Sequence, residues 1–358
     1  MGFVLAVFAS VCILLYAASL VTIFPLPKHR SYGKRTPKVS IILAALNEEK
    51  VIEKTLRSLG KTGYPDYEII VVCQGSDSTA AIAKKYARVI RDRSKGKWHA
   101  LGLGANAAKG EILYILDADS TPERGALGKL VGSIGEHGVA TGITVEEGST
   151  PTAMVFRLQT AFTNYAQYVF SRFLGTGIIQ GKNYVISKKT LHAIGGFRKA
   201  VLEDANMTFR LYLAGKKVSV VDAKCREQAP PKFKWYLKQQ LRWTLGEQAE
   251  ISKLLREFRL KDWFTLAPLG IVFGYVPPIS AAFMSLFILT SNQYFALAAL
   301  AGFITYLCSA IKFLKPKDVV FSLPSFVALS GLQIFLNLYA MLALLSGKKE
   351  IGGRTEKA

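Results

Sequence analysis

The feature that most constrains the fold is an apolar run that ends in two carboxylates one residue apart. The run extends from Ile112 to Leu116, and Asp117-Ala118-Asp119 follows it directly. A continuous apolar run of this length is typical of a strand buried on both faces of a sheet. The carboxyl ends of such strands open at the edge where α/β proteins bind ligands. Two oxygen ligands there suit a divalent cation, although aspartate is also common in ordinary strand-to-helix turns.

An apolar segment near the N-terminus predicts a membrane anchor. Phe3 to Phe24 is a stretch of 22 residues without a charge, which is long enough to cross a bilayer. It lacks the basic start and the shorter apolar core of a cleaved secretory signal. Basic side chains follow it, namely Lys28, His29, Arg30, Lys34, Arg35 and Lys38. By the positive-inside rule they place the next domain in the cytoplasm.

The C-terminal block over 263–345 predicts further membrane segments. Its three apolar stretches are Phe264 to Thr290, interrupted by Pro277-Pro278, then Tyr294 to Ile311, then Val319 to Leu345. The charged turn from Lys312 to Asp318 should be cytoplasmic, which agrees with one crossing out and one crossing back. The basic tail over 346–358 also favours the cytoplasm, which conflicts with a third crossing. A re-entrant or interfacial last stretch would resolve that conflict. We therefore predict a multi-pass integral membrane protein.

Charge indicates a membrane partner. Lys and Arg outnumber Asp and Glu by 46 to 25, which gives a formal net charge of +21. Such a charge raises the question of nucleic acid, but no nucleic-acid motif is present, and anionic lipid headgroups attract the same side chains. We predict no nucleic-acid partner. The four cysteines are scattered along the chain, which fits a reducing compartment better than a disulfide framework.

Between the apolar ends, the region 39–231 alternates strand and helix patterns, which predicts an α/β domain with a mostly parallel sheet. The predicted strands are Val39 to Leu46, Glu68 to Gln74, Arg88 to Arg91, Glu111 to Asp119, Val139 to Val145 and Lys217 to Asp222. The predicted helices are Glu48 to Leu59, Asp77 to Ala87 and Pro122 to Gly135. Polar residues follow the first, second and fourth strands, so we expect a ligand site at that edge.

Two more sequence patterns contain candidate catalytic or ligand-binding residues. Leu202-Glu203-Asp204 precedes a helix-like run, where Asp204 could act as a base kept ionised by the helix dipole, or could simply cap the helix. The amphipathic segment 232–262 contains Gln239, Arg242 and Trp243 on one helical face. The guanidinium suits a pyrophosphate and the indole suits a sugar ring. The alternative is an Arg and Trp pair that anchors a helix at the membrane surface.

Taken in this order, the motifs resemble the family 2 glycosyltransferases, membrane-bound inverting enzymes with a GT-A catalytic domain. The resemblance covers roughly Lys38 to Leu245 and, in outline, the flanking membrane segments. It implies a GT-A (nucleotide-sugar-binding) domain flanked by transmembrane helices, and a Mn²⁺ or Mg²⁺ ion held by Asp117 and Asp119. It also implies that Asp204 is the catalytic base and that Trp243 binds the acceptor. The donor-binding residues it implies are Ala45, Asn47, Glu48, Gln74, Lys97, Asp117, Gln239 and Arg242.

The chain also departs from the family pattern. Where the family usually has Asp-Asp-Gly-Ser after the second strand, this chain has Gln74-Gly75-Ser76, although a glutamine can still bond a uracil edge. Lys97 matches the family's Gly-Lys segment, but Gly102 replaces the asparagine expected beyond it. The lead-in from Tyr64 to Glu68, together with Gln74 and the Glu-Asp motif, is similar to the ceramide glucosyltransferase branch.

The resemblance implies an inverting transferase that moves a sugar from a nucleotide-sugar donor, with UDP favoured, to a lipid or membrane-proximal glycan acceptor. Within the same family, a processive polysaccharide synthase is the alternative, although three or four membrane segments are few for a polymer channel. From another class, the chain could be a membrane transport or scaffold protein that binds a nucleotide without turnover. An intact Asp204 argues against that reading, because a pure binder needs no base.

Overall fold

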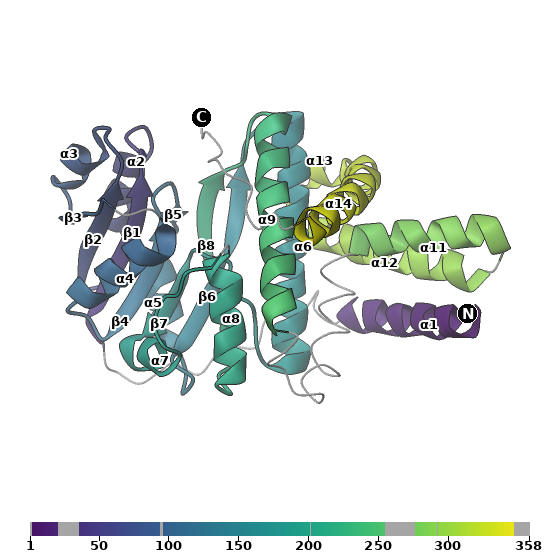
Figure 1. The fold of residues 1–358 in the computed structure, drawn as a ribbon, viewed down its shortest axis with the longest axis horizontal. Helices are drawn as coiled ribbons and strands as arrows, with labels where there is room; N and C mark the ends of the chain where they lie inside the picture. The colour runs from purple at the N-terminus through teal and green to yellow at the C-terminus, as the bar shows by residue number, and fades with distance from the viewer. Residues whose placement is uncertain are drawn as a thin grey trace. The chain divides into compact units, whose positions relative to one another are not determined.

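The computed structural model of the chain describes residues 2–20, 36–93, 96–200, 202–254, 276–291 and 293–346. They belong to two compact units (Figure 1). The sheet unit comprises 26–145 and 173–228, and the helical unit comprises 1–25, 146–172 and 229–358. Predictions for the basic residues 28–35, for 255–275 and for the tail 347–358 lie outside the described residues.

An eight-stranded sheet, in the order β3-β2-β1-β4-β7-β6-β8-β5, forms the centre of the sheet unit. Its strands are β1 Val39–Leu46, β2 Tyr67–Gln74, β3 Arg88–Arg91, β4 Ile112–Asp117, β5 Thr121–Pro122, β6 Val139–Glu147, β7 Tyr184–Ser187 and β8 Ser219–Gln228. Its helices are α2 Ile52–Leu59, α3 Thr79–Ala83, α4 Lys97–Ala107, α5 Ala126–Gly132, α7 Lys188–Ala193 and α8 Glu203–Leu213.

The sheet is parallel in one half and antiparallel in the other. β1 pairs in parallel with β2 and β4, and β2 pairs in parallel with β3. The β4–β7, β6–β7 and β5–β8 pairs are antiparallel. In the parallel half, Leu46 lies opposite Gln74, and Ala44 lies opposite Asp117. The polar residues predicted at the strand ends therefore gather at one edge, as expected.

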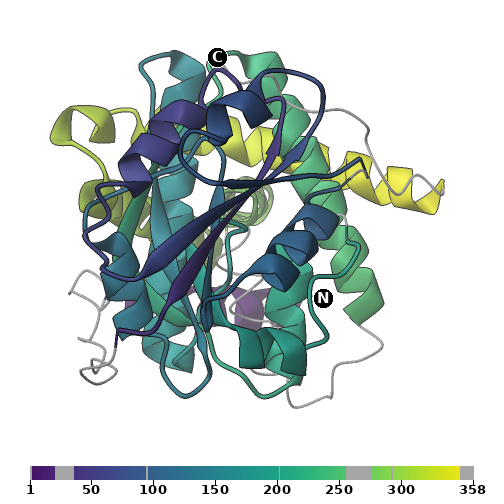
Figure 2. The same ribbon diagram turned by 90° about the vertical axis from the view of Figure 1, so that its left-hand side faces the viewer.

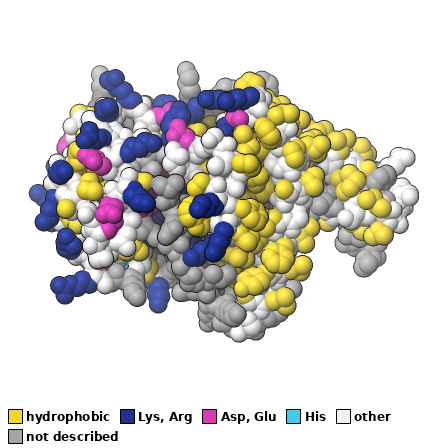
Figure 3. All heavy atoms as spheres, turned by 90° about the horizontal axis from the view of Figure 1, so that it is seen from above, with side chains coloured by type: hydrophobic (Ala, Val, Ile, Leu, Met, Phe, Trp, Pro, Cys, Tyr) yellow, Lys and Arg dark blue, Asp and Glu magenta, His cyan; other side chains and the backbone are white. Residues whose placement is uncertain are grey.

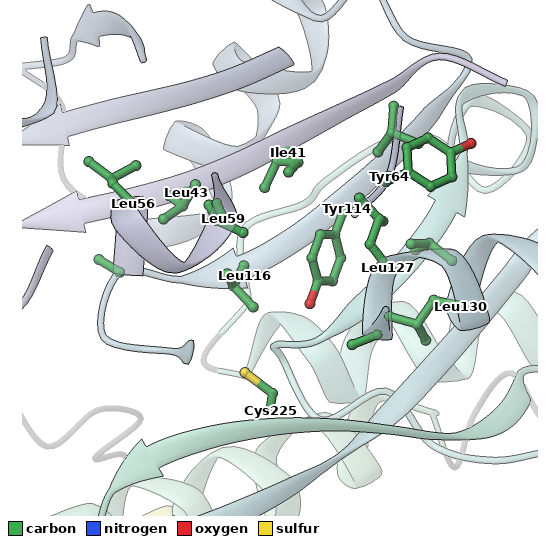
Figure 4. Packing of buried hydrophobic residues seen from close by; sticks show 14 of the residues in the cluster. Ile41, Leu43, Leu56, Leu59, Tyr64, Tyr114, Leu116, Leu127, Leu130 and Cys225 are labelled. Atoms are coloured by element: carbon green, nitrogen blue, oxygen red, sulfur yellow. The ribbon is translucent and has the colours of Figure 1, made fainter. Parts of the chain in front are cut away.

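Both faces of the sheet are buried, which confirms the strand type predicted for the run before Asp117. Tyr114 and Leu116 pack with residues of α2, α3 and α5 on one face, as Figure 4 shows for part of this cluster. Leu113 and Ile115 pack with residues of α4 and α8 on the other face. Figure 2 shows helices on the two sides of the strands. Because successive side chains of a strand point to opposite faces, β4 contributes to a hydrophobic core on each side of the sheet.

Several predicted elements are confirmed, and others are shorter, longer or unforeseen. β1 and β3 have the predicted bounds, whereas α2, α3 and α5 are shorter than predicted. β8 continues to Gln228, beyond its predicted end. The prediction was too short because the charged side chains on the exposed face of this strand interrupt its apolar pattern, although the other face is buried. Helix α4 was unforeseen because it contains Gly102 and Gly104, which disfavour helices. The short β7 and the long helix α6 were also unforeseen.

The helical unit consists of α1 Gly2–Ser19, α6 Pro151–Leu174, α9 Phe233–Leu254, α11 Val276–Thr290, α12 Gln293–Phe313, α13 Pro316–Val319 and α14 Ser322–Leu345. Two stretches, Gln293–Phe313 and Ser322–Ala340, are long and apolar enough to cross a membrane. Large apolar side chains on these helices are exposed, among them Leu297, Leu300, Val327 and Leu342. In Figure 3, hydrophobic side chains cover much of this unit, whereas Lys and Arg are prominent on the sheet unit.

The predicted apolar stretches correspond to helices of the helical unit. α1 begins one residue before the first stretch and covers it as far as Ser19. α11 begins at Val276 beside the Pro277-Pro278 pair, and α12 covers the stretch from Tyr294 to Ile311. α14 is one continuous helix of 24 residues. Whether each helix spans a bilayer, and in which direction, stays a prediction.

Candidate active site

Asp117 and Asp119 lie where β4 leaves the sheet. Asp117 is the last residue of β4, and the chain turns immediately, with the Ser120 N–H donating to the Asp117 carbonyl oxygen at 3.1 Å. The turn follows from the sequence, because the apolar run ends there and small polar residues replace it. Both aspartates are partly exposed. The two carboxylates are thus placed at the ligand-binding edge, as predicted.

Glu227 joins these aspartates, and sequence reasoning missed it. Carboxylate oxygens of Asp117, Asp119 and Glu227 all lie within 4.8 Å of one another. Glu227 belongs to β8 and is only 7% exposed. Its carboxylate accepts a hydrogen bond from the Ser120 hydroxyl and forms an ion pair with the Lys182 ammonium. A glutamate at a buried position of an alternating strand is the signal that could have revealed it, but the predicted strand ended at Asp222.

Three acidic groups with oxygen donors form a chemically suitable site for a hard divalent cation. Mg²⁺ and Mn²⁺ prefer carboxylate oxygens, and a site on one edge of a sheet leaves room for further oxygen ligands. Glu227 adds a third carboxylate to the two that the sequence predicted. The donor set therefore fits the predicted ion.

Lys97 connects the aspartate pair with the Glu203-Asp204 motif. The Lys97 Nζ lies 2.8 Å from Asp117 Oδ1 and 2.9 Å from Glu203 Oε1, and donates to the Gly181 carbonyl oxygen at 3.0 Å. Burial alone would lower the pKa of Lys97, but the Asp117 and Glu203 carboxylates together raise that pKa well above its usual value. The ammonium thus stays charged and uses its three N–H groups on three separate segments. Lys97 was predicted as a donor-binding residue, and it lies between the two acidic motifs.

Asp204 occupies the first turn of α8, as the sequence predicted. Its Oδ1 accepts a hydrogen bond from the Ala205 N–H at 2.8 Å. Residue Leu202, rather than Asp204, holds the N-cap position, and the helix has no side-chain cap bond. Asp204 is therefore not the N-cap residue, although its carboxylate bonds an N–H of the first helical turn. Burial, and next the negative charge of Glu203, raise the pKa of Asp204 to about 6, against the opposing effects of Lys97 and backbone N–H groups.

Gly181 packs closely on the Asp204 carboxylate. Its φ is +74°, and a Cβ built on it would lie 2.8 Å from Asp204 Oδ2. Only glycine suits both the left-handed backbone and the close approach. The Gly181 carbonyl also receives the Lys97 bond, so one loop residue contacts both the base candidate and the lysine.

The loops after β1 and β2 are bonded to each other. Asn47 has a positive φ of 52°, and its Oδ1 accepts from the Ser76 N–H at 3.1 Å. The Glu48 N–H donates to Thr79 Oγ1 at 2.7 Å. Asn47 and Glu48, both predicted donor-binding residues, thus lie at the expected edge. The Ala45 side chain is instead packed in the core.

Gln74 is engaged with a residue that the sequence did not single out. The Gln74 Nε2 donates to Asp92 Oδ2 at 2.6 Å and to the Gly96 carbonyl oxygen at 3.3 Å. The Asp92 side chain is 5% exposed and also lies 3.1 Å from His99 Nδ1. Both N–H groups of the Gln74 amide are thereby used within the protein. The glutamine that departs from the family pattern is therefore bonded to Gly96, the residue before Lys97.

Gln239, Arg242 and Trp243 lie on α9, which belongs to the helical unit. The helix is continuous over these residues, so their spacing places them on one face, as predicted. Arg242 is exposed, whereas Gln239 and Trp243 are partly buried. The structure thus brings Lys97, Asp117, Asp119, Asp204 and Glu227 into one region of the sheet unit. The three α9 residues are part of the helical unit.

Comparison with known proteins decides the class of this domain. Residues 40–201 match the family described as Glycosyl transferase family 2. The chain contains a family 2 glycosyltransferase domain. A mannosyltransferase structure from Pyrobaculum calidifontis, PcManGT in complex with GDP-Man and Mn²⁺, shares the fold with a TM-score of 0.59 at 19% identity. That similarity covers 95% of this chain and 99% of the other. The sheet and its helices thus form a GT-A fold, as predicted.

Curated relatives of this chain include both lipid and polysaccharide enzymes. The probable glycosyltransferase YdaM of Bacillus subtilis is 31% identical over 263 residues, which is 65% of this chain and 60% of that protein. A beta-monoglucosyldiacylglycerol synthase of Trichormus variabilis is 28% identical over 215 residues, 54% of this chain and 46% of that protein. A poly-beta-1,6-N-acetyl-D-glucosamine synthase of Staphylococcus epidermidis is 25% identical over 253 residues, 66% of this chain and 59% of that protein. The chain spans 60% or less of the length of these three relatives.

Proposed function

We propose that this chain is an inverting glycosyltransferase that moves a sugar from a nucleotide-sugar donor, with UDP favoured, to a membrane lipid. The observation that carries the proposal is the contact of one lysine with both acidic motifs. Lys97 lies 2.8 Å from Asp117 and 2.9 Å from Glu203, the neighbour of Asp204. Groups suited to a leaving diphosphate and a group suited to an attacking hydroxyl are therefore assembled in one site.

Asp204 is proposed as the base that takes the proton of the acceptor hydroxyl. Its pKa of about 6 keeps it mostly ionised at pH 7 while making it more basic than an ordinary aspartate. A hydroxyl that attacks in line, opposite the departing diphosphate, inverts the anomeric carbon. An α-linked donor would then give a β-linked product.

The diphosphate side of the reaction needs positive charge. Asp117, Asp119 and Glu227 would hold a Mn²⁺ or Mg²⁺ ion, which would supply electrostatic stabilisation of the leaving diphosphate. The Mn²⁺ in the PcManGT complex supports a divalent ion for this fold. Arg242 is proposed as a diphosphate-binding group with Gln239 beside it, and Trp243 as the platform for the acceptor. Asn47, Glu48 and Gln74 are proposed to bind the nucleotide, together with the backbone of Ala45.

A lipid acceptor is favoured by the helices and by one class of relatives. Two helices, Gln293–Phe313 and Ser322–Ala340, are apolar enough to cross a membrane. The beta-monoglucosyldiacylglycerol synthase of Trichormus variabilis supports a glycerolipid acceptor. The basic segment after the first apolar stretch supports a cytoplasmic catalytic domain in a multi-pass protein.

A processive polysaccharide synthase is the second candidate, because a poly-beta-1,6-N-acetyl-D-glucosamine synthase is among the relatives. The two candidates differ in product. A lipid glycosyltransferase gives a lipid that carries one or a few sugars, whereas a synthase gives a polymer that grows with time.

The experiment is a nucleoside diphosphate release assay on the purified full chain in lipid nanodiscs. A panel of nucleotide sugars is supplied with Mn²⁺, with and without membrane lipid extract, and the products are separated by mass. We expect release that depends on lipid and yields a short glycolipid. Polymer without lipid dependence would favour the synthase. Donor binding without release, unaffected by Asp204→Asn, would favour the non-catalytic alternative and overturn the proposal.

A further inference from the structure

Helix α6 lies outside every motif that the sequence displayed, yet it makes specific contacts with the helix that carries Gln239, Arg242 and Trp243. Both helices belong to the helical unit. α6 is 24 residues long, and its buried face includes Phe156. The contacts are of two kinds, a ring stack and a chain of amide hydrogen bonds.

The ring stack restrains Trp243. The Phe156 ring lies 5.9 Å from the Trp243 ring, centroid to centroid, with an interplanar angle of 29°. The same Phe156 ring packs edge to face with the Tyr236 ring, at a centroid distance of 5.8 Å and an interplanar angle of 83°. Phe156 is 4% exposed and Tyr236 is 1% exposed, so both rings are fixed by their surroundings. One face of the indole is therefore occupied by α6, and a sugar would have to stack on the opposite face.

The hydrogen-bond chain restrains the helix one turn away. Tyr236 Oη donates to Gln159 Oε1 at 3.0 Å, and Gln159 Nε2 donates to Gln240 Oε1 at 2.8 Å. Gln240 is 3% exposed and is adjacent to Gln239 in the chain. Gln240 is buried and Gln159 is partly buried, and the bond between the two amides is directional because a donor must meet an acceptor. The chain thus fixes the rotation of α9 about its axis.

The start of α6 is fastened as well. The Arg157 guanidinium, next to Phe156, forms an ion pair with Asp318 of α13 and donates to the Gly148 carbonyl oxygen at 3.3 Å. Asp318 is 3% exposed and lies between the two candidate membrane helices. α6 therefore joins the α9 motif to the turn between those helices.

We propose that Phe156 and Gln159 are positioning residues for the Gln-x-x-Arg-Trp motif: Phe156 sets the plane of the Trp243 indole, and Gln159 sets the rotation of α9. The inference rests on the proposed function, in which Trp243 binds the acceptor and Arg242 the diphosphate. Side chains held by packing and hydrogen bonds keep a site in its productive geometry, and a displacement of about 1 Å can cost about 100-fold in rate.

The test compares two matched substitutions on α6, Phe156→Leu and Phe162→Leu. Phe162 is also buried, at 7% exposure, and its ring lies 5.8 Å from Tyr306 of α12 rather than on α9. Each variant removes one buried ring from the same helix, so we expect similar losses of thermal stability. Full-length protein in nanodiscs is assayed with the nucleotide sugar that gives turnover and with membrane lipid extract.

We expect Phe156→Leu to lower lipid-dependent transfer by about 5-fold to 20-fold, and Phe162→Leu by less than about 2-fold. Gln159→Leu should also lower transfer, by about 3-fold to 10-fold. A spectroscopic readout accompanies the assay. The near-ultraviolet circular dichroism of the Trp243 indole, obtained by subtracting the Trp243→Phe spectrum, should change in Phe156→Leu and not in Phe162→Leu.

A double substitution separates positioning from structure. If Phe156 acts through the indole, Phe156→Leu should add less than about 2-fold to the loss already caused by Trp243→Leu. Equal effects of the Phe156 and Phe162 variants, or full additivity with Trp243→Leu, would overturn the inference. Normal transfer by Trp243→Leu itself would instead refute the proposed role of Trp243, so the two failures are distinguishable.

Discussion

The sheet unit and the helical unit hold their functional residues by different forces. In the sheet unit, charge organises the site: Lys97 bridges Asp117 and Glu203, and Lys182 pairs with Glu227. In the helical unit, the α9 motif is held by the Phe156 ring and the Gln159 amide, which are neutral. Ionic contacts respond to protons, metal ions and salt, whereas stacked rings and amides do not.

The two halves of the proposed reaction should therefore differ in what affects their rate. The carboxylates of the sheet unit should make activity depend on metal and on pH. The contribution of the α9 residues to activity should depend on the packing of α6 and should not change with pH. Substitutions in the two units should therefore differ in their dependence on metal and on pH.

The largest expected effect is that of Asp119→Asn. The amide keeps the shape but removes one negative ligand, so metal-dependent turnover should fall by about 1000-fold or more while the fold is retained. Turnover is measured against added Mn²⁺, and metal binding is measured separately by calorimetry. Asp222→Asn, at an exposed position of β8, is the control. Full activity in excess chelator would contradict the metal role.

Asp204→Asn should lower transfer by about 100-fold to 10,000-fold, because an amide cannot accept the hydroxyl proton. Donor affinity should stay close to normal, since the proposed partner of Asp204 is the acceptor. Calorimetry with the nucleotide sugar checks the affinity, and product formation checks the rate. A variant that fails to bind the donor would show that Asp204 serves the donor side instead.

Arg242→Ala should produce the opposite pattern, with a loss of donor affinity of about 10-fold to 100-fold together with a loss of rate. Arg242 is exposed, so the loss should be smaller than for a fully buried charge pair. Arg242→Lys, which keeps the charge but not the bidentate geometry, should lie between the two. Normal donor binding by Arg242→Ala would remove α9 from the donor site.

Much of this site could be predicted from the sequence, because its signals are local. The apolar run before Asp117 defines a buried strand, and the acidic start of α8 is visible in the chain order. Glu227 has no local signal beyond its place in an alternating strand, and Asp92 has none. Each is brought to the site by strand pairing between segments distant in sequence, and neither belongs to a motif.

Helix α6 illustrates a second limit. Its sequence is amphipathic, but nothing in it tells which neighbour its buried face will meet. The stack of Phe156 on Trp243 joins residues 87 positions apart in the chain, a tertiary contact without a local signature. Gln74 shows a different limit. Its departure from the family pattern is visible in the sequence, but its hydrogen-bond partner Asp92 is not.

The pH dependence of transfer should follow Asp204. With a pKa of about 6, the base is protonated at lower pH, so transfer should rise with pH through about 6 and level off above 7. One pH unit below the pKa, about a tenth of the base is ionised, which predicts a loss of about 10-fold. The Phe156→Leu variant should show the same midpoint at a lower plateau. A shifted midpoint in that variant would show that the packing of α6 affects the pKa of Asp204.

The smallest expected effect concerns stability. The pKa of Asp204 rises from 3.8 to about 6 on folding, so the folded state favours the protonated form. Ionising the group therefore costs folding free energy, a cost that is absent below pH 4, grows as pH rises towards 6 and is complete above it. Asp204→Asn removes that cost, so the variant should be more stable at pH 7.5, on the order of 1 kcal/mol, with no gain near pH 4. Thermal unfolding at the two pH values measures this gain in stability, with Asp222→Asn as the exposed control. If Asp204 is a base whose ionised form destabilises the folded state, Asp204→Asn should be inactive and should unfold at a higher temperature. A variant that unfolds at a lower temperature at pH 7.5 would mean that Asp204 stabilises the folded state.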